Sequence, residues 1–90
     1  MNLFDTDICW VYITDDGRRR RILFCTDDER DAQLRPRLER GERAVYCRRF
    51  DNTFDALAHK LMLQSLSAST IDCLIRRYRK LTSDEITSIV

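Results

Sequence analysis

The chain has 90 residues, a net charge of +1, 43% hydrophobic residues and 34% charged residues, which indicates one folded domain and excludes a disordered chain. A net charge so close to zero does not by itself indicate that the protein binds a polyanion. No apolar run approaches the ~18 residues of a membrane span, and the N-terminus lacks a signal-peptide pattern, so we expect a cytoplasmic protein with no membrane partner.

A β-hairpin is predicted near the start of the chain. Residues 9–14 are an apolar run of aromatic and β-branched types, typical of a strand buried on both faces. An Asp-Asp-Gly sequence at 15–17 is a strong turn signal. Residues 18–25 then predict the returning strand.

The first helix is predicted over residues 27–39. Thr26 and Glu29 have the spacing of a capping box, in which each side chain bonds the other residue's backbone amide. Pro36 removes a backbone donor, so we expect a kink or an early end there. Gly41 favours a stop shortly afterwards.

A third strand is predicted over residues 43–50, and residues 51–53 provide a cap for a helix from Phe54 to about Gln64. The apolar residues of this helix at helical spacing are Phe54, Leu57, Ala58 and Leu61.

Ser67 or Ser69 is the predicted cap of a further helix, whose apolar face runs from Ile71 to Tyr78. Residues 82–85 repeat the capping-box pattern before a short apolar tail. The predicted fold is α+β (α/β), a small three-stranded antiparallel sheet flanked by helices in the order β-β-α-β-α-α, with residues 1–90 as one domain.

Four cysteines are too widely spaced to suggest a zinc site, which usually pairs its ligands two to five residues apart. Cys9, Cys25 and Cys47 lie in apolar stretches, so we predict buried free thiols there. The fourth cysteine is Cys73.

Four segments carry a resemblance to a known family: Trp10-Val11-Tyr12, Thr26-Asp27-Asp28, the stretch from Val45-Tyr46 to Phe50-Asp51, and Leu66-Ser67 with the helix that follows. In type and spacing, residues 9–80 resemble the small single-domain members of the GIY-YIG nuclease superfamily. The resemblance implies phosphodiester hydrolysis, in which tyrosines help to activate water, an arginine steadies the phosphate and a glutamate holds one divalent cation.

The residues at the family's catalytic positions differ from that pattern. Tyr12 matches the first tyrosine, but the second tripeptide begins at Arg21 or one residue later and supplies neither tyrosine nor glycine. The helix arginine falls on Asp31 or Ala32, and the metal-binding glutamate falls on Lys60. An ammonium group repels a cation, so nuclease activity is not inherited from the family, and we expect no metal or other cofactor.

A relocated metal site is an alternative. Asp55 and His59 are four residues apart and share one helix face, which would let them bind a metal weakly. The other interpretation of this pair is a solvated helix face, which is the commoner case.

Arginines suggest a nucleic-acid surface, since guanidinium groups match phosphate geometry. The candidate residues are Arg18, Arg19, Arg20, Arg21, Arg30, Arg35 and Arg48, and Arg49, Arg76, Arg77, Arg79 and Lys80 extend the set. Alternatively, the run at 18–21 protects an edge strand from aggregation, and the late cluster stabilises a helix C-terminus. Tyr12, Tyr46 and Tyr78 are candidates for base stacking or, more simply, for core packing.

Three functions follow from these patterns. The first is a catalytically inactive GIY-YIG-like domain that binds a partner, with DNA or RNA as the first candidate. The second is a protein-interaction or homodimerisation module that uses apolar surface near Trp10 or at Ile86, Ile89 and Val90. The third is a divergent metal-dependent endonuclease with its site at Asp55 and His59.

Overall fold

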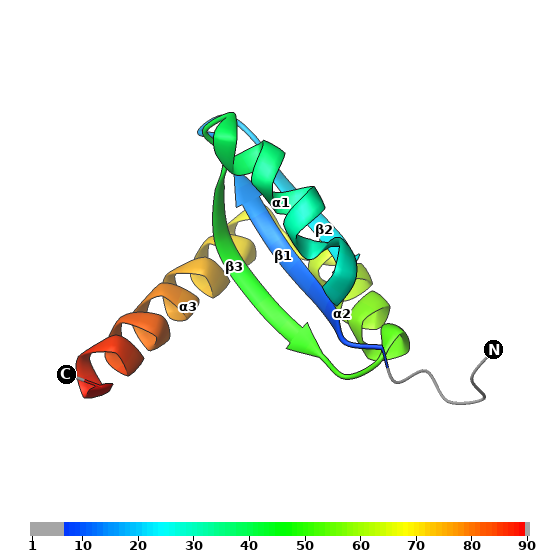
Figure 1. The fold of residues 1–90 in the computed structure, drawn as a ribbon. Helices are drawn as coiled ribbons and strands as arrows, with labels where there is room; N and C mark the ends of the chain where they lie inside the picture. The colour runs from blue at the N-terminus through cyan, green and yellow to red at the C-terminus, as the bar shows by residue number, and fades with distance from the viewer. Residues whose placement is uncertain (1–6, 90) are drawn as a thin grey trace.

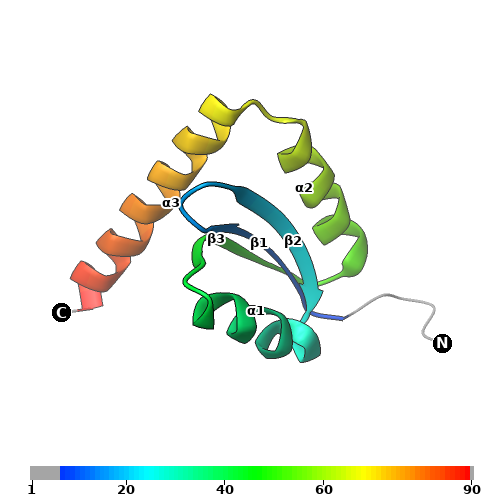
Figure 2. The ribbon, with the colours of Figure 1, turned by 90° about the horizontal axis from the view of Figure 1, so that it is seen from above.

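Three antiparallel strands form the centre of the domain, and helices cover both faces of the sheet (Figures 1 and 2). The computed structural model describes residues 7–89, with side chains for residues 7–80. The central strand is β1 (Cys9–Asp15), flanked by β2 (Arg20–Thr26) and β3 (Arg43–Phe50). The predicted α+β class and the order β-β-α-β-α-α are confirmed.

The β1–β2 turn is fixed by aspartate side chains. Asp16 Oδ1 accepts the backbone N–H groups of Arg18 at 2.8 Å and Arg19 at 2.7 Å, and Asp15 Oδ1 accepts that of Gly17 at 2.7 Å. Gly17 has a φ of 93°, a conformation that favours glycine. The turn predicted from the sequence is therefore present, and its carboxylates take up the amides that the tight connection leaves free.

One face of the sheet carries the main hydrophobic core. Cys9, Val11 and Ile13 of β1 are fully buried against α2 (Thr53–Ser65) and α3 (Ala68–Ile89). The helices contribute four buried residues to this core: Ala56, Leu63, Ile71 and Ile75. The alternate residue Tyr12 is equally buried on the other face, which confirms a central strand covered on both sides.

The opposite face is covered by α1 (Arg30–Glu39), which follows a short 3₁₀ turn, η1 (Asp27–Glu29). Figure 2 shows the sheet between α1 and α2. No residue of α1 is fully buried, and polar side chains of the helix, Arg30 and Gln33, meet the aromatic side chains of β1. This second layer is therefore thin and polar.

Two details of the first helix differ from prediction. The Thr26 side chain makes no capping hydrogen bond, because the chain enters a 3₁₀ turn before the α-helix begins at Arg30. The α-helix continues through Pro36 to Glu39, so it does not end early at the proline.

The caps of the later helices agree better with the sequence. Asn52 Oδ1 accepts the N–H of Asp55 at 2.8 Å and begins α2 at Thr53. Ser67 Oγ accepts the N–H of Thr70 at 3.3 Å at the start of α3. Residues 82–85 lie inside the continuous helix α3, so they do not start a new element. Within the described part of the chain, no helix combines the length and the apolarity needed to cross a bilayer.

Candidate nucleic-acid interface

Tyr12, which matches the family's first tyrosine, is a buried hydrogen-bond donor. Its hydroxyl donates to Gln33 Oε1 of α1 at 2.8 Å, and its side chain is inaccessible to solvent. Burial raises the pKa of Tyr12 to about 12, and the neighbouring Cys25 thiol adds to the effect while Arg37 opposes it. The hydroxyl is consequently protonated near neutral pH and anchors α1 to the sheet.

The other family-matching positions do not gather around Tyr12. Asp31 lies on the exposed side of α1, where Arg35 Nη2 contacts its carboxylate at 3.1 Å. Arg21 lies opposite Thr14 in the β1–β2 register, towards the hairpin turn. Lys60 belongs to α2, which packs on the sheet face opposite to Tyr12. The four positions are thus divided between two faces of the sheet.

Arg30 is held by an aromatic ring. Its guanidinium carbon lies 4.0 Å from the centre of the Trp10 ring, while Trp10 Nε1 donates to Asp27 Oδ1 at 2.9 Å. These contacts fix the beginning of α1 against β1. They also cover part of the surface near Trp10 on which a protein partner was predicted to bind.

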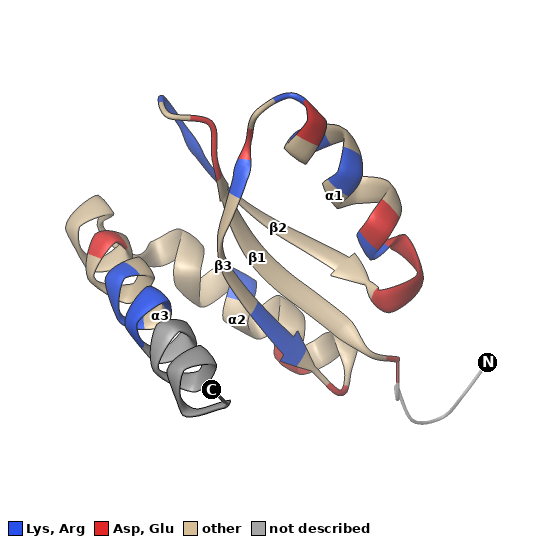
Figure 3. Ribbon diagram, turned by 60° about the vertical axis from the view of Figure 1, so that its left-hand side comes forward, with Lys and Arg blue, Asp and Glu red and all other residues tan. Residues whose placement is uncertain are grey.

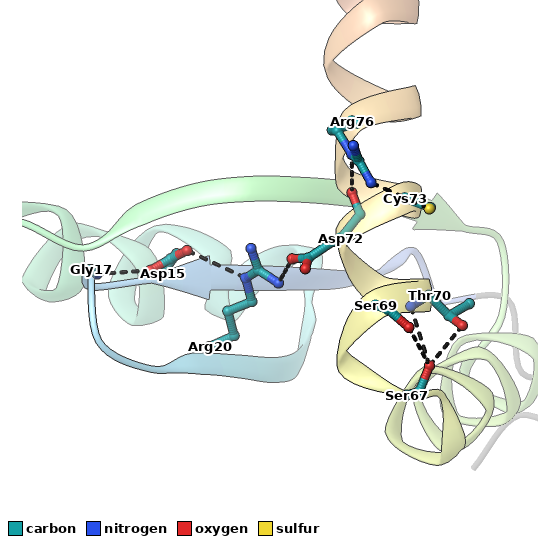
Figure 4. Close-up of polar contacts among 9 residues, drawn as sticks. All are labelled: Asp15, Gly17, Arg20, Ser67, Ser69, Thr70, Asp72, Cys73 and Arg76. Carbon is teal, nitrogen blue, oxygen red and sulfur yellow. Dashed lines mark hydrogen bonds and ion pairs between the residues drawn. The ribbon is translucent and has the colours of Figure 1, made fainter.

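Arg20 links the hairpin to α3. Its guanidinium contacts Asp15 at 3.3 Å and also contacts Asp72 of α3 (Figure 4). The exposed residues Arg18 and Arg19 flank the turn. Arg48 lies on the α2 and α3 side of β3, with its guanidinium carbon 5.1 Å from the centre of the Phe50 ring. The seven predicted arginines therefore lie on different faces and do not form one surface.

A second group of cations does gather. Four exposed cations lie within one turn and a half of α3: Arg76, Arg77, Arg79 and Lys80. Tyr78, between them in sequence, packs against Tyr46 of β3 with ring centres 5.3 Å apart. Figure 3 shows this basic part of α3 and, apart from it, a basic segment at the end of β3. We call Arg48, Arg76, Arg77, Arg79 and Lys80 the α3–β3 basic surface.

Among the side chains that the structure describes, few acidic groups offset this charge. Asp72, which precedes the cations on α3, is engaged by Arg20. The side chains of residues 7–80 include no ion-pair partner for Arg77, Arg79 or Lys80. Arg49, whose neighbour Arg48 belongs to the basic surface, points to the other sheet face and pairs with Asp51 at 3.0 Å.

His59 lies within an aromatic cluster beside Arg48. Its Nε2 is 2.8 Å from the Tyr46 hydroxyl, and its ring centre lies 5.1 Å from that of Phe50. Burial lowers the pKa of His59 below its ordinary value, and the charge of Arg48 lowers it further. The imidazole is therefore neutral near pH 7, and one of its two nitrogens already has a partner.

The alternative metal site at Asp55 and His59 has few free ligands. Asp55 Oδ2 accepts Asn52 Nδ2 at 2.9 Å as part of the α2 cap, and His59 Nε2 bonds Tyr46. Across the described residues, no group of three or more His, Cys, Asp or Glu side chains is arranged to hold a metal ion.

The thiols follow the sequence prediction closely. Cys9 and Cys25 are buried, Cys47 is half-buried and Cys73 is exposed. Burial raises the pKa of Cys25 to about 11 and also raises that of Cys47. Since thiolates are the reactive form, these two cysteines serve as packing groups on the α1 side of the sheet.

Sequence reasoning missed an exposed apolar surface on α2. Phe54, Leu57 and Leu61, the predicted apolar face, are 78%, 41% and 66% exposed, whereas Ala56 and Leu63 face the core. The strongest apolar stripe of this helix thus faces solvent. The sequence did contain one indication of this surface: α2 has apolar residues on both sides, which is unusual for a surface helix.

Comparisons with family models, with curated proteins and with solved structures find no match to this chain.

Proposed function

We propose that this chain is a non-catalytic GIY-YIG-like domain that binds the phosphate backbone of a nucleic acid through the α3–β3 basic surface. The observation that carries the proposal is the group of exposed cations on α3, which have no carboxylate partner among residues 7–80. Arginine forks bind phosphate oxygens in two-pronged geometry, and four of the five cations are arginines.

Binding through this surface would involve the phosphate backbone of the nucleic acid and not its bases. Two of the three tyrosines proposed for stacking, Tyr12 and Tyr46, are buried, at 0% and 7% exposure. Tyr78, the tyrosine beside the cations, is half-buried against Tyr46, so affinity comes mainly from phosphate contacts and the release of counterions. We therefore expect weak sequence preference and a strong dependence on salt.

The environment of Tyr12 and the position of Lys60 support a non-catalytic role. A general base must accept a proton near the working pH, whereas Tyr12 has a pKa of about 12 and its hydroxyl donates a hydrogen bond to Gln33 Oε1. Lys60 brings a positive charge to the position where the resemblance implies a metal-binding glutamate, and it lies on the other side of the sheet.

Fluorescence anisotropy with a labelled duplex at about 50 and 200 mM salt tests the proposal. Replacing Arg77, Arg79 and Lys80 by glutamine should weaken binding at least tenfold and lower the slope of log K against log salt by about 2 to 3, because each lost phosphate contact removes about 0.9 from the slope on duplex DNA. Single-stranded DNA and RNA are measured in parallel to identify the preferred form.

A matched control removes the same charge elsewhere. The variant in which Arg18, Arg19 and Arg21 are replaced by glutamine changes the net charge equally and should keep most of the affinity. If the hairpin variant loses affinity and the α3 variant does not, the interface is on the hairpin and the assignment to α3 is wrong. If the unmodified protein shows no salt-dependent binding at micromolar concentration, the nucleic-acid proposal itself is wrong.

A further inference from the structure

The outward side of α2 carries a continuous apolar stripe, formed by Phe54, Leu57, Ala58 and Leu61, with Met62 at its edge. On a helical wheel this stripe lies opposite Ala56 and Leu63, which are both fully buried. The apolar character of these four side chains is therefore not explained by packing in the core. We call the first four residues the α2 stripe.

The α2 stripe is large enough to matter energetically. Its side chains together expose roughly 400 Å² of apolar area, within the range of about 300–600 Å² for the largest patch on a typical monomer, which is often functional. A standard interface buries about 800 Å² on each partner, so the stripe supplies about half of that area as an apolar centre.

The α2 stripe contains no charged residue. The nearest ionisable groups, Asp55 and Lys60, lie on opposite flanks of the helix, one on each side of the stripe. A charged stripe would select a partner of opposite sign, whereas an uncharged one can meet its own copy without repulsion. This property agrees with the requirement of a two-fold interface, in which the same surface patch is used by both subunits.

We infer that the α2 stripe is a self-association surface whose partner is a second copy of this chain, with the two α2 helices antiparallel. A two-fold axis at the Leu57–Ala58 step places Phe54 against the partner's Leu61, so the bulky residues at the two ends of the stripe cover each other. Leu57 of one copy then lies beside Ala58 of the other, and both contacts are next to the axis.

This arrangement also keeps like charges apart. With the axis between residues 57 and 58, the two copies of Asp55 are displaced by five residues, about 7.5 Å along the helices, and the two copies of Lys60 by the same distance. Both groups stay at the solvent-accessible rim, where salt and water screen them. The inference does not depend on nucleic-acid binding, since α2 and the α3–β3 basic surface use different residues.

Sedimentation equilibrium over a concentration series tests the inference. The unmodified chain should change from monomer to dimer as concentration rises, and Leu61→Lys should stay monomeric. Because Leu61 is 66% exposed, the variant should keep its fold, which circular dichroism checks. Leu38→Lys is the matched control, since Leu38 is an exposed leucine on α1, at 51%, and the variant should dimerise normally.

The register has a separate test in a Cys73→Ser background. Ala58→Cys should give a cross-linked dimer with a short bifunctional maleimide, because the two copies of residue 58 meet near the axis. Gln64→Cys should not, because the antiparallel register separates its copies by about 20 Å. A chain that remains monomeric at millimolar concentration, or equal cross-linking at both positions, would overturn the inference.

Discussion

The Tyr46 hydroxyl and His59 Nε2 are 2.8 Å apart on the sheet face that α2 covers. Burial lowers the pKa of His59, and the charge of the neighbouring Arg48 lowers it further. Protonation would place a second positive charge beside Arg48 inside a partly dehydrated cluster. The folded domain therefore holds His59 in its neutral form.

Stability should fall with acidity as a consequence. The unfolded chain takes up a proton on His59 near the ordinary pKa of about 6.5, and the folded chain does so only at lower pH, so the stabilising effect of the neutral imidazole is lost as pH falls through this interval. We expect the Tm of the unmodified protein to decrease more between pH 7.5 and 5 than that of His59→Gln, which keeps a hydrogen-bonding group without titrating. Identical pH profiles for the two proteins in differential scanning fluorimetry would contradict the assignment.

Thiol reactivity should separate the four cysteines. Cys73 is exposed on α3, whereas Cys25 has a pKa raised to about 11 and Cys9 is inaccessible. A thiol reagent at pH 8 should therefore modify one thiol per native chain quickly and all four only after unfolding. Cys73→Ser should remove the fast phase, and a fast phase that persists in this variant would show that a β-strand cysteine is accessible.

At the level of single elements, α2 offers a direct test of which side faces the core. Leu63→Ala removes a fully buried side chain and should lower the free energy of unfolding by about 3 kcal/mol. Leu61→Ala, two residues away, should cost less than about 0.5 kcal/mol, because Leu61 is 66% exposed. Urea unfolding at low protein concentration, where self-association does not contribute, compares them, and equal losses would mean that α2 is rotated.

The elements themselves were largely predictable because their signals are local. The apolar run at 9–14, the turn at 15–17 and the Asn52 cap involve neighbouring residues, so the sequence contains everything that determines them. The start of α1 was not predictable in the same way, since the Thr26 side chain has other geometries available and a 3₁₀ turn replaced the capping box. Which side of α2 is buried depends on the sheet beneath it, and no pattern within 54–64 contains that information.

At the scale of the whole molecule, the arrangement of the arginines was the least predictable property. Arg30 and Arg48 were both predicted to belong to one nucleic-acid surface, yet they lie on opposite faces of the sheet. The Arg30 guanidinium lies over Trp10 and that of Arg48 beside Phe50. Tyr46 of β3 and Tyr78 of α3 are 32 residues apart in sequence, yet they pack against each other in the fold. Contacts between residues so far apart in sequence depend on the topology of the fold. The sequence therefore shows a run such as Arg18–Arg21 directly, but it does not show which distant residues come together.

Arg20 joins Asp15 of the hairpin to Asp72 of α3 (Figure 4). Asp72 lies near the start of α3, which packs on the sheet as far as Tyr78 and then extends 11 further residues to Ile89, about 16 Å, away from the sheet (Figure 1). The end of α3 is therefore a projecting arm that is attached to the sheet by the first half of the helix. A rotation of 10° near the start of α3 would move its far end by about 4 Å, so the packing of Ile71, Ile75 and Tyr78, to which the exposed Arg20 bridge adds little, fixes the direction of the whole helix.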